Sequence, residues 1–433
     1  MSNFSKYVDD FSIDNDVISP SPWTLPSHFS IFTGKYVSEH GMERIKGEVT
    51  YYQLLSRVKK SNLKLLTEEL KERGYTTLGY SANPFVSPLT GIDRGFDSFV
   101  AIEQRHLPEK LQSKLNKLKD KGNTLNDILR SLLYSGDLRN LAELPFLYYK
   151  FQREQKKSGF PRDKGGLYMV DLLTHTSLRK PFFVFFNFME MHEPYLKTET
   201  LNNPFGGFQD LLGISRISDS TLAKMKAIYD SQVFVVDRLL GKLLDYLKSI
   251  NAYDDTLIIL TSDHGQAFKE NNYYGHGLFL YDEIIKVPLL IKYPLNYSGE
   301  IKNLLSLSDI YRLILGCADG LRVQLVGGST RPIFSESYGT FIDKKDFTHH
   351  TDALKRLYEI NVNRKAILRD GYKLTINSTT GDVEEFSFKG RRIRLEGYEA
   401  IYQSLVKELE LFKEAEEFSV KKEAKREEFK EQL

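Results

Sequence analysis

The chain has very little cysteine, no excess of one charge and no apolar run long enough to cross a bilayer. Only one of its 433 residues is a cysteine, Cys317, which excludes an internal disulfide framework and favours a reducing compartment such as the cytoplasm. The 60 Lys and Arg residues balance 58 Asp and Glu residues, so no net field points to nucleic acid or to an anionic membrane surface. We therefore expect a cytoplasmic protein that binds neither.

Membrane and export signals are also lacking. The longest apolar run, residues 181–189, is about half the length that a membrane helix needs. The residues after Met1 show neither the basic start nor the apolar core of a signal peptide. The apolar run is therefore interpreted as a buried strand, and the sequence predicts no membrane segment.

Several short apolar runs without polar alternation recur along the chain, separated by stretches with helical spacing. Runs of this kind are typical of strands buried on both faces, as in a parallel sheet covered by helices. The fold class predicted is α/β, with a mainly parallel sheet. The strands are expected at residues 75–80, 181–189, 256–261 and 287–293, and the clearest helices at residues 63–73 and 218–249.

The composition changes along the chain and suggests how it is divided. We expect residues 1–300 to form the main domain, interrupted at about residues 103–164 by a Lys-rich helical insertion. Short strand-like pieces indicate a smaller C-terminal α+β subdomain at residues 301–397. Residues 398–433 mix Glu and Lys at helical spacing, which predicts a charged, solvated helix.

Thr24 is the first candidate for chemistry. Pro26 favours the first turn of a helix and Gly34 favours its end, so the Thr24 hydroxyl is expected at a helix N-terminus. Unpaired N–H groups there favour an anionic substrate and a partly deprotonated hydroxyl. A nucleophile and an anion site would then coincide, although a Thr that merely caps a helix would have the same pattern.

A second group of candidates follows the apolar run at residues 256–261. Asp263 and His264 come at the carboxyl end of that strand, where ligand sites form in open α/β sheets. His276 lies between two glycines, which allows the backbone to approach a bound anion. Carboxylate and imidazole together suit Zn or Mn, so we predict a divalent metal ion here.

His192 is a third candidate, because it follows the Phe-rich run directly. An imidazole at a strand end can protonate a leaving group or contact an anion. A loop histidine hydrogen-bonded to its neighbours is the alternative interpretation.

Taken together, these segments resemble the sulfatase-like proteins of the alkaline phosphatase superfamily. The resemblance implies an alkaline phosphatase-like fold and a two-step displacement, with a Zn, Mn or Ca ion as cofactor. It implies that Thr24 attacks the ester and touches the metal, that Asp263 and His264 bind the metal, and that His192 and His276 contact the anion or leaving group. The similar segments are residues 21–34, 66–99, 189–195 and 261–294, with weaker similarity at residues 306–309 and 331–336.

The chain departs from the family pattern at three places. Sulfatases proper modify a Cys or Ser within a Cys/Ser-x-Pro-x-Arg pattern, but here that window has Thr24 and ends in His28. The basic Lys-x-His pair of many sulfatases is also missing near Asn83. Only 23 residues precede Thr24, so we expect the family's first strand, which ends in metal-binding Asp, to be absent. The possible substitutes are expected in a helix and loop: Asp9, Asp10, Asp14 and Asp16.

The sequence therefore predicts a metal-dependent hydrolase that cleaves a small anionic ester through a covalent Thr24 intermediate. Because Thr replaces the modified residue, a phosphate monoester, phosphate diester or phosphonate is expected rather than a sulfate. A phospho-group transferase using the same covalent step is the enzymatic alternative. The non-enzymatic alternative is a binding protein that kept the fold and lost catalysis.

Overall fold

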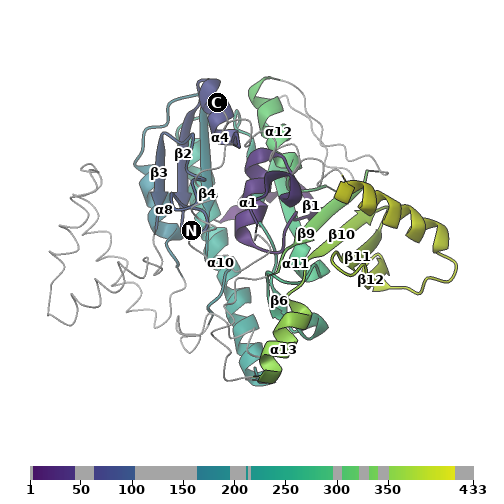
Figure 1. The fold of residues 1–433 in the computed structure, drawn as a ribbon. Coiled ribbons are helices and arrows are strands. Elements are labelled where there is room, and N and C mark those ends of the chain that lie inside the picture. Colours follow the sequence, from purple (N-terminus) through teal and green to yellow (C-terminus); the bar gives the residue numbers. More distant parts are fainter. Residues whose placement is uncertain are drawn as a thin grey trace, which may run out of the picture.

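The computed structural model describes residues 3–43, 63–102, 163–195, 211–212, 216–295, 305–320, 331–339 and 351–414. In these ranges helices pack around two three-stranded sheets, and a five-stranded antiparallel sheet follows (Figure 1). All but the last two residues of the predicted insertion lie outside the described ranges, as do residues 415–433 of the predicted tail. No helix in the described ranges is both long and apolar enough to cross a bilayer.

The first sheet is parallel, as predicted. Its central strand β2, Thr76–Ser81, pairs in parallel with β3, Ser98–Ala101, and with β4, Phe182–Asn187. Helix α4, Leu66–Glu72, leads into β2 through Gly74, whose φ of 81° explains the glycine. The Phe-rich run thus forms a strand of this sheet.

The second sheet is antiparallel throughout, which differs from the predicted direction of two strands. Its central strand β8, Lys286–Lys292, pairs with β1, Ser12–Ile18, and with β5, Ile258–Thr261. Parallel neighbours need a connection that crosses back over the sheet. Here the connection forms a small hairpin and a single helical turn, so β8 begins near the end of β5: these elements are β6 Ala267–Phe268, β7 Tyr274–Gly275 and α11 Asp282–Ile285.

The two sheets share the helices that cover them. Helix α10, Asp219–Ser249, begins at its N-cap Ser218 and buries neighbouring residues against different sheets. Its Leu243 packs with the β2 and β4 side chains, whereas Leu244 packs with the β5 side chains. On the other face, Ile31 packs against the hydrophobic clusters of both sheets. The carboxyl ends of β4 and β5 lie near the same helix, because His28 of α1 contacts both Asn187 and Asp263.

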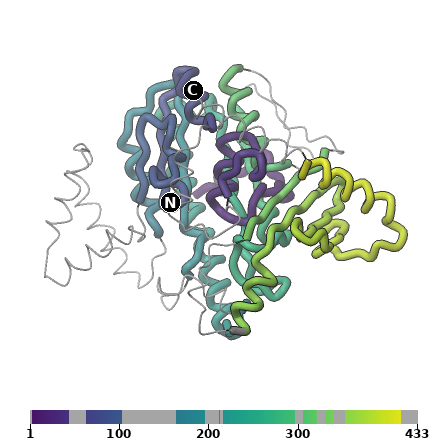
Figure 2. Tube along the Cα trace, viewed as in Figure 1, coloured from purple at the N-terminus to yellow at the C-terminus, as the bar shows by residue number. Residues whose placement is uncertain are grey.

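The C-terminal part of the chain packs to one side of these layers, as the yellow trace in Figure 2 shows. We predicted a solvated helix at residues 398–433, but the described helix, residues 399–414, packs one face on the sheet and buries Leu405 and Leu409. The predicted domain limits stay predictions. The antiparallel strands are β9 Ile333–Ser337, β10 Arg364–Arg369, β11 Tyr372–Asn377, β12 Val383–Phe388 and β13 Arg391–Arg392.

The remaining elements are mostly short. Helix α8 lies beside α10, and α12 packs on α1 and α4. Their bounds are η1 Phe4–Lys6, η2 Val8–Asp10, α1 Thr24–Thr33, α2 Val37–His40, α8 Gly166–Thr174, η3 Glu270–Asn272, α12 Asp309–Ala318 and α13 Thr351–Ile360.

Candidate active site

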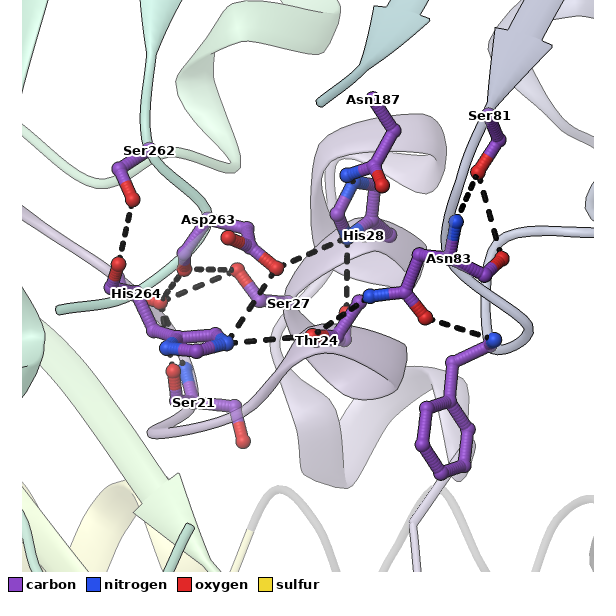
Figure 3. A network of polar contacts seen from close by, with 12 residues as sticks. Ser21, Thr24, Ser27, His28, Ser81, Asn83, Asn187, Ser262, Asp263 and His264 are labelled. Atoms are coloured by element: carbon purple, nitrogen blue, oxygen red, sulfur yellow. Dashed lines mark hydrogen bonds and ion pairs between the residues drawn. The ribbon is translucent and has the colours of Figure 1, made fainter. Parts of the chain in front are cut away.

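Thr24 is the first residue of helix α1, and its hydroxyl faces the second group of candidates. The N-cap of α1 is Trp23, in extended conformation and without a side-chain cap, and the helix ends at Gly34 with φ 69°. The Thr24 side chain therefore does not cap the helix. It is almost fully buried, and its Oγ1 lies 3.2 Å from His264 Nε2 and 3.4 Å from Asn83 Nδ2 (Figure 3).

Asp263 and His264 follow β5 directly, at the same site. The Asp263 Oδ2 atom lies 3.6 Å from His264 Nε2 and 3.4 Å from His28 Nδ1. The Asp263 backbone is held in place because its carbonyl accepts the Ser27 hydroxyl at 2.7 Å. The residue after His264 must be glycine, since a Cβ on Gly265 would lie 2.2 Å from the Glu283 carbonyl oxygen.

His192 and His276 join His264 in a cluster of three imidazoles. The His264 and His276 rings stack with centroids 4.3 Å apart, and the His192 ring lies 5.0 Å from His276 and 6.4 Å from His264. In each ring Nδ1 lies 2.7–2.9 Å from an oxygen, of Glu193, Gly265 or Gln266. An oxygen of a carbonyl or amide only accepts, so each Nδ1 carries the proton and each Nε2 keeps its lone pair.

Burial lowers the pKa of three imidazoles around the Asp263 carboxylate. It lowers the pKa of His192 to about 4 and the pKa of His276 well below the ordinary value. It also lowers the pKa of His28. Burial acts to raise the pKa of Asp263, but the imidazoles of His264 and His28 bring that pKa below its ordinary value. One negative charge among nitrogen lone pairs is an arrangement that attracts a cation.

Two residues of the site were not identified as functional from the sequence. His28, at the position of the sulfatase Arg, accepts from Asn187 Nδ2 at 3.2 Å and donates to the Thr24 carbonyl at 2.9 Å (Figure 3). Asn187 ends β4, and its buried Oδ1 has no hydrogen bond within the described ranges. The sequence did contain a signal for Asn187, because it is the one polar residue at the carboxyl end of a Phe-rich strand, where ligand sites form.

A set of three metal ligands at this site has to include the Thr24 hydroxyl oxygen. Within the described part of the chain, no group of three His, Cys, Asp or Glu residues could hold a metal ion. The His264 Nε2 atom, however, lies 3.2 Å from Thr24 Oγ1 and 3.6 Å from Asp263 Oδ2. Ligands of a tetrahedral Zn ion at about 2.1 Å are themselves about 3.4 Å apart, and catalytic sites keep one position open. The two distances from His264 Nε2 are therefore close to that spacing.

The N-terminal acidic residues lie elsewhere, and one expectation about them was wrong. Asp14 and Asp16 belong to strand β1, not to a helix or loop, because the segment pairs with β8. Asp16 lies 3.6 Å from Lys286 Nζ, and Asp10 accepts the Tyr253 hydroxyl at 2.6 Å. Neither carboxylate is thus positioned to substitute for a metal ligand beside Asp263.

Comparison with known proteins identifies the family. The Sulfatase family profile matches residues 2–321. Human Arylsulfatase K is 26% identical over 199 residues, covering 46% of this chain and 35% of that protein, and Endo-4-O-sulfatase of Bacteroides thetaiotaomicron is 25% identical over 197 residues, covering 42% and 39%. The chain thus spans well under half the length of these curated relatives.

A solved structure shows the same fold. Phosphonate monoester hydrolase of Agrobacterium radiobacter superposes with a TM-score of 0.61 at 15% identity, covering 96% of this chain and 90% of that one. The fold is therefore of the sulfatase and alkaline phosphatase type, as predicted. The chain belongs to the sulfatase family.

Proposed function

We propose that this protein is a metal-dependent hydrolase that cleaves a small phosphate ester or phosphonate through a covalent bond to Thr24. The observation that supports this most directly is the position of the Thr24 hydroxyl, 3.2 Å from His264 Nε2 and at the start of a helix. The absence of a Cys or Ser at this position favours phosphorus over sulfur, because no aldehyde can be installed on Thr.

The anion would bind at the N-terminus of α1. The first N–H groups of a helix have no partner within it, and the helix dipole favours negative charge there. Asn83 Nδ2 lies 3.4 Å from the Thr24 hydroxyl and can donate to an oxygen of the transferring group. A phosphoryl group in front of Thr24 therefore meets donors from both α1 and the segment after β2.

Thr24, Asp263 and His264 would hold the metal ion. One carboxylate, one imidazole and one hydroxyl suit Zn or Mn better than Ca, which prefers oxygen ligands alone. When bound, such an ion lowers the pKa of a coordinated hydroxyl and stabilises charge on the transferring group. His28 keeps the Asp263 carboxylate in place, at 3.4 Å.

The reaction has two steps. In the first, Thr24 Oγ1 forms a bond to phosphorus, the bond from phosphorus to the ester oxygen breaks, and that oxygen leaves with its electron pair and takes up the proton of the Thr24 hydroxyl. In the second, a water oxygen bonds to phosphorus, the bond to Oγ1 breaks, and a water proton passes through an unprotonated imidazole to Oγ1. His192 and His276 are assigned to the leaving-group and water side, because their neutral Nε2 atoms can accept that proton.

The test is hydrolysis of aryl phosphate, phosphodiester, phosphonate and sulfate substrates with added Mn or Zn. We expect turnover of a phosphorus ester that is lost on chelation. Preferred release of aryl sulfate would overturn the substrate class, and transfer to an added alcohol in place of water would identify a transferase. No turnover of any class would favour the non-catalytic alternative. A cytoplasmic location remains a prediction from the single cysteine.

A further inference from the structure

A fully buried carboxylate lies two residues before His192. Glu190 follows strand β4 and is 0% exposed. Its Oε1 accepts the backbone N–H of Lys164 at 3.0 Å and of Gly166 at 2.8 Å, at the amino end of α8. Its Oε2 is buried without a hydrogen bond among the described residues. A carboxylate this costly to bury needs a role, and the proposed reaction does not use it.

The contact between Glu190 and α8 is tight and specific. A Cβ on Gly166 would lie 2.7 Å from Glu190 Oε1 and 2.4 Å from Leu239 Cδ1, so only glycine leaves room for the carboxylate. Burial and the neighbouring Asp163 carboxyl raise the pKa of Glu190 to about 7, and burial raises the pKa of Asp163. Each acid therefore favours its uncharged form more than a free carboxyl group does, which lessens their repulsion.

Lys164 links this carboxylate to His192. Its N–H is held by Glu190, and its Nζ donates to the His192 carbonyl oxygen and lies 5.6 Å from the centre of the Tyr195 ring. The His192 ring is then placed 5.0 Å from the His276 ring. A continuous set of contacts thus runs from Glu190 through Lys164 to the imidazole cluster.

We propose that Glu190 is a positioning residue: it holds the amino end of α8 so that Lys164 fixes the turn that carries His192. The carboxylate acts through Lys164 and touches no substrate. The charged or titratable residues beside Glu190 are Asp163 and Lys164, and those beside His192 are Lys164, Asp263, His264 and His276. The role of His192 in catalysis rests on the proposed function, whereas the position of its ring in the structure does not.

The test is NMR of the full chain carrying ¹⁵N-labelled histidine, titrated to follow His192. Glu190→Gln keeps the Oε1 acceptor and can donate to Asp163, so the His192 pKa should remain near about 4. Glu190→Leu removes the acceptor, and the loosened, hydrated imidazole should titrate closer to 6.5. The matched control is Glu68→Leu, because Glu68 accepts a backbone N–H at the start of α4 at 2.7 Å.

Unchanged His192 titration in a folded Glu190→Leu protein would overturn the proposal, as would an equal shift in Glu68→Leu. If Glu190→Leu does not fold, Lys164→Met keeps the backbone N–H that Glu190 holds, removes the Nζ contact to the His192 carbonyl, and should produce the same shift. The readout is independent of turnover. A shifted His192 with unaltered kcat would refute the catalytic role of His192 and leave the positioning role standing.

Discussion

The Thr24 hydroxyl lies 3.2 Å from His264 Nε2 although 240 positions separate the two residues. Thr24 begins helix α1, and His264 follows strand β5. The His264 Nδ1 atom donates to the Gly265 carbonyl at 2.9 Å, so Nε2 presents its lone pair to the hydroxyl or to a shared cation. The contact joins the two halves of the proposed active site.

Removing the Thr24 hydroxyl should abolish turnover without unfolding the protein. We expect Thr24→Val to lower kcat/KM by about 10³-fold or more, because it removes the hydroxyl proposed to form the covalent intermediate. Thr24→Ser should keep measurable activity. The matched control is Thr33→Val at the other end of α1, whose hydroxyl bonds only the Phe29 carbonyl among the described residues, at 2.6 Å. Equal losses in both Val variants would point to the helix, not to the nucleophile.

Removing the Asp263 charge should weaken metal binding. Asp263→Asn keeps the shape of the side chain but not its negative charge, so the Kd for Mn measured by calorimetry should rise by about 10-fold or more. Asp282→Asn is a suitable control, because Asp282 is a half-buried carboxylate paired with Lys373 at 2.8 Å. Undiminished Mn affinity in Asp263→Asn would remove this residue from the metal site.

The buried imidazoles predict acid sensitivity. The pKa of His192 is lowered to about 4, so the unfolded chain takes up a proton first as the pH falls. Its stabilising contribution is complete above about pH 6.5 and is lost between about pH 6.5 and 4, at a cost on the order of 1 kcal/mol for a half-buried group. Urea unfolding across this range should show a shallower pH slope in His192→Gln.

The control for that slope is His175→Gln, because His175 is exposed. Its slope should equal that of the unmodified protein. If both variants flatten the pH dependence of the unfolding free energy equally, that dependence does not come from the partial burial of His192.

A buried ion pair should anchor the C-terminal sheet. Glu336 is 0% exposed, accepts from Lys365 Nζ at 2.6 Å, and accepts from the Ser38 N–H at 2.9 Å. Glu336→Ala leaves the lysine charge buried without this partner, so unfolding free energy should fall by about 3 kcal/mol. Glu72→Ala, which removes an exposed partner of Lys64, should cost less than about 0.5 kcal/mol in the same urea titration. Similar losses of unfolding free energy in the two variants would show that the buried Glu336 ion pair stabilises the protein no more than an exposed one.

Elements with a strong local pattern could be predicted from the sequence. The run at residues 181–189 forms β4, Phe182–Asn187, and the stretch at 218–249 forms α10 with Ser218 as its N-cap. Pro26 in a first turn and Gly34 at the end predict a helix that starts near Thr24, and the structure agrees. In these cases the local signal and the tertiary packing point to the same element.

Features set by tertiary contacts were harder to predict. Strand direction in the second sheet depends on how the chain between β5 and β8 folds, and apolar composition does not encode it. His28 and Asn187 meet only because α1 lies at the carboxyl end of β4, 159 positions away. The burial of Leu405 likewise depends on a sheet that the charged Glu and Lys pattern did not reveal.

The central claim is a covalent bond to Thr24, and rapid-quench mass spectrometry tests it most directly. The protein, loaded with Mn, is mixed with an aryl phosphodiester, quenched in acid within one turnover and digested. A phosphoryl adduct should appear on the peptide that contains Thr24 and be missing in Thr24→Val. Steady hydrolysis without any adduct, or an adduct on a different residue, would contradict the claim.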